Sequence, residues 1–278
     1  MNIDMRTITP DVAAAMLERN METNRSVRTT YVHQLAHEME QGRFVSGNGQ
    51  TIVVTKDGVL IDGQHRLHAI VESGRTYEFP VATVDSANAF KTIDVGTPRR
   101  ISDYYRSCPN ANAVATVGKT MYCAEYGSLG VIGCMGGRLD SNTTASKPAV
   151  IEYIDANLEA MVDLASTARS LYRALNYGSV VAFGAFVGIV RLVGRDAALA
   201  SFVSEYENMA STNATVSLLK ATVVQRNIRN RNDFARVLFE AYERYSRGDA
   251  IKRLSVSDHY IKKYDGALNE WRRFREVE

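Results

Sequence analysis

The chain has 278 residues, of which 45% are hydrophobic and 23% charged, and its formal net charge is +2. This length is sufficient for two hydrophobic cores, and the hydrophobic content excludes an intrinsically disordered chain. The sequence shows no signal peptide and no membrane-spanning run, and its three cysteines lack metal-site spacing, so we expect a cytoplasmic protein with reduced thiols and no membrane partner.

Two helices are predicted before the first expected strand. A start signal at Thr9 predicts a helix over residues 11–20, and residues 26–41 have the periodicity of a second, amphipathic helix. In that second helix we expect Tyr31 and Met39 to face inward. Both helices would then brace the strands that follow them.

A β-hairpin is predicted next. Residues 50–55 are β-branched and apolar, Asp57 and Gly58 form a turn signal, and residues 59–61 provide the returning strand. The polar, glycine-containing segment at 43–49 precedes this hairpin. We expect it to form an entry loop that could lie over a bound ligand.

The hairpin leads directly into a helix. Residues 64–73 change to helical periodicity, and residues 77–84 read as a further strand. Asp62 and Gly63 therefore stand at a helix N-terminus, where unpaired backbone N–H groups and the helix dipole favour an anion. Gly63 would let a phosphate approach the backbone closely.

The polar face of this helix carries several groups with useful chemistry. Arg66 could clamp phosphate oxygens, and His65 could donate to them or transfer a proton near neutral pH. One alternative is an ordinary solvated face, with Asp62 acting only as the helix N-cap. Another is a metal site built from His65, His68 and Glu72, which share that face.

These residues resemble a known family. The sequence Asp-Gly-Gln-His-Arg-Leu-His-Ala at 62–69 looks like the Gly-x-x-Arg phosphate-binding motif of the ParB N-terminal and sulfiredoxin-like superfamily. The stretches 58–74 and 93–100 together resemble ParB-like proteins encoded by bacteriophages and mobile elements. This resemblance covers about the first hundred residues and implies an α+β fold, a small mixed sheet with helices. Its members include CTP-hydrolysing partition clamps, ATP-dependent phosphotransferases and a disputed nuclease, so the fold alone does not select a reaction.

The resemblance transfers to individual positions. Gly63 and Arg66 match the superfamily's glycine and arginine, and Gln64 and His65 occupy the variable pair between them. Sulfiredoxin carries its catalytic cysteine in this pair, so sulfinic-acid reduction is not expected here. His68 stands where partition proteins tend to have another arginine.

A second group of candidate anion-binding residues follows the last predicted strand. Thr97 can cap a helix that runs to residue 105, which would place Arg99 and Arg100 in its first turn. Cations are unfavourable at that end of a helix, and a bound anion would compensate for them. The alternative is that both arginines extend into water. Asp94 could hold a magnesium ion, orient an arginine or simply form a turn.

The chain changes character after residue 107, so we predict a phosphate-binding domain over 1–107 and an all-helical domain over 108–278. The segment 127–137 has several glycines but no Walker pattern, and we expect a mobile loop. Residues 179–193 should form a central buried helix. The other predicted helices cover 113–126, 147–177, 196–210, 215–229, 233–246 and 257–274.

Basic residues concentrate near the C-terminus. From Lys220 onward there are 14 Lys plus Arg against 9 Asp plus Glu, whereas the preceding 219 residues hold 19 against 22. The candidate contacts to a nucleic-acid backbone are Arg226, Arg229, Arg231, Lys262 and Lys263, with Tyr260, Tyr264 and Trp271 as stacking faces. A solvated surface explains much of the same pattern.

The preferred hypothesis is an NTP-dependent, DNA-associated protein that hydrolyses NTP or transfers its phosphoryl group. CTP or ATP with Mg²⁺ is the expected cofactor. We also expect a homo-oligomer, located in the host cytoplasm if a phage encodes the chain. The expected catalytic residues are Asp62, His65 and Arg66, and the expected nucleotide contacts are Gly63, Gln64, His65, Arg66, His68, Thr97, Arg99 and Arg100. The alternatives are a non-catalytic DNA-binding adaptor and a metal-dependent nuclease built around His65, His68 and Asp94.

Overall fold

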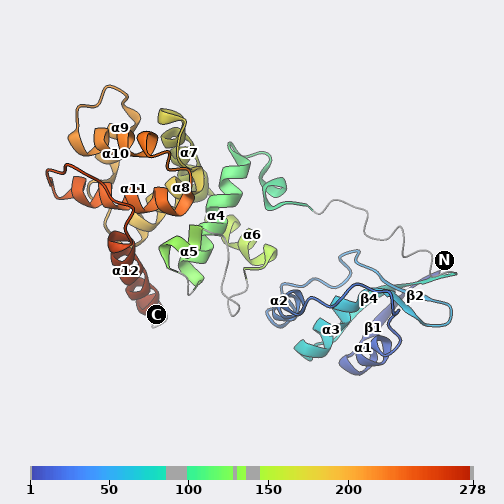
Figure 1. Ribbon diagram of the computed structural model, residues 1–278. Helices are drawn as coiled ribbons and strands as arrows, with labels where there is room; N and C mark the ends of the chain where they lie inside the picture. The colour runs from blue at the N-terminus through green and yellow to red at the C-terminus, as the bar shows by residue number, and fades with distance from the viewer. Residues whose placement is uncertain (1, 86–98, 128–129, 136–144, 276–278) are drawn as a thin grey trace. The chain divides into compact units, whose positions relative to one another are not determined.

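The computed structural model describes residues 2–85, 99–127, 130–135 and 145–275 (Figure 1). The chain is α+β and forms two compact units, Met1–Pro98 and Arg99–Glu278. The division therefore comes at 98/99, whereas the sequence placed it at 107/108. The reason is a short 3₁₀ helix, η2 (Ile101–Tyr105), because its Tyr105 is buried in the core of the second unit.

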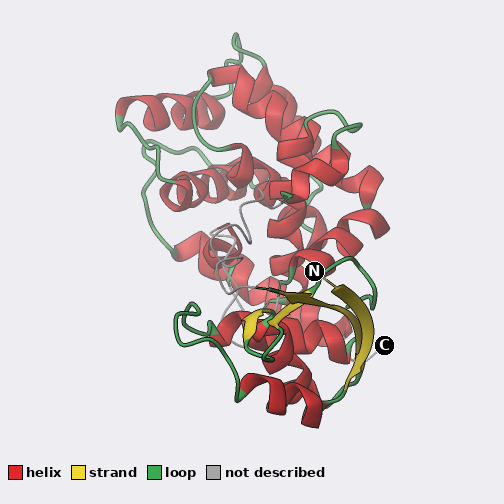
Figure 2. Ribbon diagram, turned by 90° about the vertical axis from the view of Figure 1, so that its right-hand side faces the viewer, coloured by secondary structure: helices red, strands yellow, loops and turns green. Residues whose placement is uncertain are grey.

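The described strands all belong to the first unit, where they form one mixed sheet (Figure 2). The strand order is β1-β4-β2-β3, with β4 parallel to β2 and the other two pairs antiparallel. The elements of this unit are β1 (Asn2–Ile8), α1 (Pro10–Leu17), α2 (Thr29–Glu40), β2 (Ile52–Thr55), β3 (Leu60–Asp62), α3 (Gln64–Ser73) and β4 (Tyr77–Val84). Strand β1 was not anticipated from the sequence.

The predicted hairpin and the helix that follows it are confirmed. Strands β2 and β3 pair antiparallel across a turn in which Gly58 has φ +78°, a left-handed conformation that favours glycine. Helix α3 then spans the predicted residues and ends at Gly74, whose amide donates to the Ile70 carbonyl at 3.1 Å. Buried residues from both strands and from α3, including Ile52 and Leu67, share one core.

One face assignment in α2 was wrong. Val32, Ala36 and Met39 are buried, but Tyr31 is 48% exposed. The buried positions follow a spacing of three to four residues that excludes position 31, so the tyrosine lies at the edge of the helix's apolar face. This exposure leaves Tyr31 available to line a pocket.

The described part of the second unit is helical. Beyond η2 it contains α4 (Ala111–Tyr126), α5 (Val131–Met135), α6 (Lys147–Ala156), α7 (Leu158–Leu175), α8 (Val180–Leu192), α9 (Leu199–Glu207), α10 (Ala214–Gln225), α11 (Arg231–Ser246) and α12 (His259–Arg275). The single helix expected over 147–177 is divided at Asn157.

Helix α8 is the central buried helix that the sequence predicted. Every residue from 182 to 190 is buried. A Cβ at Gly184 would collide with Val117, and one at Gly188 with Met121, so both glycines permit α4 to pack closely against α8. The loop expected over 127–137 was wrong for residues 131–135, which form α5 with Cys134 buried in the same core.

Candidate functional site

Five consecutive motif residues line one pocket in the first unit. The pocket has a volume of about 560 Å³, and its wall includes Asp62, Gly63, Gln64, His65 and Arg66. The remaining lining residues come from other parts of the same unit: Arg25, Tyr31, Gln50, Thr51 and Val53. The sequence motif is thus a continuous stretch of the wall of an open pocket.

The start of α3 has the geometry expected of an anion site. Gly63 occupies the N-cap position with φ 109°, and as a glycine it supplies no side chain that could cap the first-turn amides. A Cβ at Gly63 would lie 3.1 Å from Cγ1 of Ile52, so the turn is both left-handed and crowded. The first-turn N–H groups of α3 therefore remain for a ligand to bind.

Asp62 is not the helix N-cap, contrary to the alternative drawn from the sequence. Its Oδ2 instead accepts a hydrogen bond from Nη2 of Arg66 at 2.8 Å, and both side chains are largely buried. This ion pair holds the guanidinium at the pocket wall. An anion that bound to Arg66 would compete with the Asp62 carboxylate for it.

The His65 ring connects α3 to the start of α2. The ring is buried, and its Nε2 accepts a hydrogen bond from the backbone N–H of Arg28 at 3.1 Å. The Tyr31 ring packs edge-on against it, with centroids 5.5 Å apart. A solvated face was the alternative drawn from the sequence for His65, but these contacts bury the ring because the segment before α2 folds over the first turn of α3.

The surroundings of His65 favour its neutral form. Burial lowers the pKa of its imidazole, and the nearby Arg25, His68 and Arg28 side chains lower it further, while Asp62 opposes them. Since Nε2 accepts the Arg28 hydrogen bond, the neutral ring carries its proton on Nδ1. His65 therefore has a hydrogen to donate, and its Nε2 is occupied and cannot serve as a general base.

Gln64 has a positioning role that the sequence did not reveal. Its buried side chain donates from Nε2 to the Arg25 carbonyl at 2.7 Å, and its Oε1 accepts from Nδ2 of Asn20 at 3.1 Å. These two bonds fix the segment between α1 and α2 at the pocket wall. The Gln64 side chain thus shapes the pocket that it also lines.

Sequence reasoning missed half of the pocket wall. Arg25 belongs to a polar segment between two helices, and Tyr31 was assigned to a core face. Gln50 and Thr51 directly follow the loop 43–49, which was expected to lie over a ligand. The polar composition of residues 20–28, with two arginines, was the available signal for the missing part of the wall.

The other predicted residues near the motif do not line this pocket. His68 is half-buried on α3, and the Glu72 carboxylate is hydrogen-bonded to Nδ1 of His33 at 2.6 Å. Within the described ranges, no group of three or more His, Cys, Asp or Glu side chains could hold a metal ion. Thr97 and Asp94 lie outside the described residues.

Arg99 and Arg100 belong to the second unit, where the expected first-turn placement is wrong. They precede η2, and the Arg100 amide donates to Oδ2 of Asp103 at 2.7 Å. This bond and the Arg106 guanidinium lower the pKa of the Asp103 carboxyl. Because Asp103 already supplies a negative charge at this helix start, no bound anion is needed to compensate for the arginines.

Only some of the basic and aromatic C-terminal residues are exposed as a contact with nucleic acid requires. Lys263 bonds to the buried carboxylate of Glu243, and Tyr260 and Tyr264 are buried in the core, so they cannot stack on bases. The tyrosines lie on the apolar side of α12, which packs against α11. Four predicted contacts are exposed: Arg226, Arg229, Arg231 and Lys262.

Comparison with known proteins gives no relative for this chain: no family model, curated protein or solved structure matches it. Among the described helices, none combines the length and apolar character required to cross a membrane. The chemistry of the pocket residues is therefore the basis for assigning a function.

Proposed function

We propose that the first unit binds the phosphates of a nucleoside triphosphate, CTP or ATP, in the pocket lined by Asp62 to Arg66, and that the chain acts on DNA. The observation that carries this proposal is the continuous motif wall of one open pocket. Its volume of about 560 Å³ lies within the range of about 300–1,000 Å³ typical of small-molecule sites.

The charges of the wall favour an anion. Two guanidinium groups, from Arg25 and Arg66, line the pocket together with one carboxylate, from Asp62. The charge of Arg28 also acts on the ring of His65 in the wall. Uncapped amides at the start of α3 add partial positive charge, so a phosphate would gain both hydrogen bonds and Coulombic stabilisation.

Phosphate binding would rearrange the Asp62–Arg66 pair. The guanidinium would turn part of its donor fork to phosphate oxygens and stabilise charge that develops during hydrolysis or phosphoryl transfer. Asp62, released from that bond, would orient water or an acceptor hydroxyl, and His65 would donate from Nδ1. A magnesium ion bound with the nucleotide would neutralise phosphate charge.

DNA contact is assigned to the second unit. Arg226, Arg229 and Arg231 are exposed within six residues, at the end of α10, in the connection and at the start of α11. This short basic segment could follow a phosphate backbone. If the first pocket held only a DNA phosphate, the chain would be a non-catalytic adaptor with the same basic segment.

A thermal-shift screen with CTP, ATP and GTP, each with and without Mg²⁺, tests nucleotide binding. A ligand present at about 100 times its Kd should stabilise the first unit by about 2.7 kcal/mol. Arg66→Gln should abolish this stabilisation, whereas Arg75→Gln, exposed just beyond α3, should retain it. Absence of any shift at millimolar nucleotide would refute the NTP proposal.

A DNA-binding titration of the same variants separates the two functions. The nucleotide proposal expects Arg66→Gln to retain DNA binding, while an Arg226, Arg229 and Arg231 triple Gln variant loses it. The adaptor alternative expects Arg66→Gln to weaken DNA binding as well, in the absence of any nucleotide effect.

A further inference from the structure

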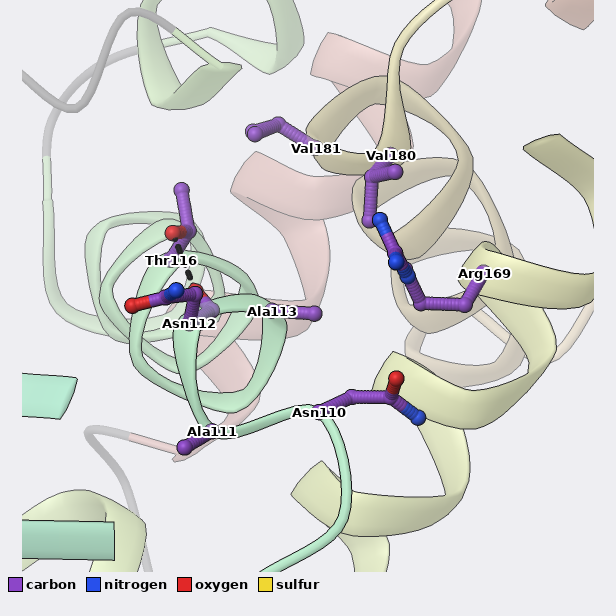
Figure 3. Close-up of a pocket in the computed structure, with 8 residues that line it drawn as sticks. All are labelled: Asn110, Ala111, Asn112, Ala113, Thr116, Arg169, Val180 and Val181. Atoms are coloured by element: carbon purple, nitrogen blue, oxygen red, sulfur yellow. Dashed lines mark hydrogen bonds between the residues drawn. The ribbon is translucent and has the colours of Figure 1, made fainter. Parts of the chain in front are cut away.

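The second unit contains a separate pocket, of about 340 Å³. It lies where the first turns of α4 and α8 meet α7 (Figure 3). The lining residues are Asn110, Ala111, Asn112, Ala113, Thr116, Arg169, Val180 and Val181. This pocket is independent of the function proposed for the first unit.

Arg169 gives the pocket a positive charge. Of the eight described residues that line it, Arg169 is the one that ionises. Its Nε is buried and has no hydrogen-bond partner in the described part of the chain. By contrast, Arg191 on α8 pairs with Asp163 at 2.7 Å. A buried guanidinium N–H without an acceptor is unfavourable, so a ligand that supplied an acceptor would be stabilised.

The other groups of the pocket suit the oxygens and the body of such a ligand. Figure 3 shows Arg169 extending from α7 toward Val180, with Asn112 and Thr116 on the α4 side. The Thr116 hydroxyl donates to the Asn112 carbonyl at 2.6 Å, so its lone pairs remain free to accept hydrogen bonds. Ala113 and Val180 offer apolar contacts.

The backbone at the pocket adds a supporting dipole. Helix α4 begins after Asn110, which has φ 59° and makes no side-chain cap bond. At α8 the Ser179 hydroxyl accepts from the Ala182 amide at 3.3 Å, and Val180 and Val181 begin the helix at the pocket. Both helix N-termini therefore place partial positive charge near Arg169.

We propose that this pocket binds a phosphate group, with Arg169 as its charged anchor. The guanidinium provides Nε–H and Nη–H donors in the fork geometry that matches phosphate oxygens, and the α4 amides complete the cradle. The apolar lining then holds the first carbons attached to the phosphate. The group can come from a small phosphorylated molecule or from the end of a nucleic acid.

Titration of the full chain with inorganic phosphate, followed by NMR, tests this proposal at the site itself. The amide resonances of Ala111 and Asn112 should shift in a saturable manner, with sodium chloride at equal ionic strength as the reference. In Arg169→Gln the affinity should fall at least about tenfold, since a charge-assisted bond is lost. Arg173→Gln, exposed on the same helix, should leave the titration unchanged.

A second variant keeps the arginine and the fold. Asn110→Asp is isosteric, aspartate is a preferred N-cap residue, and it tolerates the left-handed conformation. Its carboxylate should oppose phosphate binding at the wall while the spectrum of the folded protein is retained. Unchanged phosphate affinity in this variant would contradict the proposal.

Two further ligands test whether the phosphate group comes from a small molecule or from a nucleic acid. Ribose 5-phosphate and a 5′-phosphorylated oligonucleotide should both shift the same amides, and the one that saturates at lower concentration identifies the source. The proposal is overturned if acetate shifts these amides and phosphate does not, or if phosphate shifts them equally in wild type and Arg169→Gln.

Discussion

The two pockets both lie at helix N-termini and both contain arginine, but they differ in how that arginine is neutralised. In the first unit Arg66 pairs with Asp62, four residues earlier. In the second unit Arg169 has a buried Nε without a partner among the described residues. The comparison indicates that a ligand must displace an internal carboxylate in the first pocket, whereas no carboxylate is among the described residues that line the second.

The largest expected effect concerns the backbone at the two pockets. Gly63 has φ 109° and a crowded Cβ position, whereas Asn110 has φ 59°, which asparagine tolerates. Gly63→Ala should cost about 1–3 kcal/mol of local stability, because alanine is strained in this conformation. Asn110→Gly should change stability by less than about 0.5 kcal/mol.

Hydrogen exchange measures both substitutions locally. The Leu67 amide donates to the Gly63 carbonyl, and the Val114 amide donates to the Asn110 carbonyl, each at 3.0 Å. The Leu67 amide should exchange much faster in Gly63→Ala than in wild type. The exchange rate of the Val114 amide should be nearly unchanged in Asn110→Gly. Equal protection of Leu67 in Gly63→Ala and wild type would show that the glycine is not required.

An intermediate effect is expected from removing the internal competitor. Asp62→Asn retains the shape of the side chain but leaves Arg66 without its anionic partner. A partly buried pair of this kind is worth about 1 kcal/mol, so nucleotide affinity should rise about fivefold while turnover falls. Calorimetric titration beside a phosphate-release assay would separate these effects. Weaker binding would instead mean that Asp62 contacts the ligand.

The smallest expected effect is a pH dependence of the free energy of unfolding of the first unit. The folded state lowers the pKa of His65 from its ordinary value of 6.5, chiefly through burial. Below pH 6.5 the unfolded chain therefore binds a proton that the folded ring resists, and the free energy of unfolding decreases as the pH falls. The stabilisation is fully present above that pH.

His65→Gln should flatten this pH profile, because glutamine does not titrate and its Oε1 can accept the Arg28 hydrogen bond. Exchange of the α3 amides at pH 7.5 and 5.5, in wild type and variant, is the appropriate measurement. Parallel profiles for the two proteins would exclude His65 as the source of the pH dependence.

The success of sequence reasoning differed between elements for physical reasons. Helix α3 and the β2–β3 hairpin were predicted well because their turn glycines and periodicities act locally. Strand β1 was missed, since its residues are exposed except for Ile8 and carry no buried alternation. Helix α5 was missed because glycines flank five residues whose burial depends on distant helices.

The pocket residues show the same division. Asp62, Gly63 and Arg66 were identified because their spacing alone places them at a strand-to-helix turn, while the roles of Gln64 and His65 depend on bonds to residues 20–28. Arg25 reaches the pocket because its segment bonds to Gln64 and His65, and Tyr31 because α2 packs onto α3.

The sequence by itself determined the local geometry at Gly63 and the order of the elements around it, because backbone sterics and short-range periodicity act within a few residues. Tertiary structure decided which side chains are paired or buried. It bonded the His65 ring to the Arg28 amide and placed Arg169 beside the first turns of α4 and α8. Burial and long-range hydrogen bonds depend on neighbours that only the folded chain brings together.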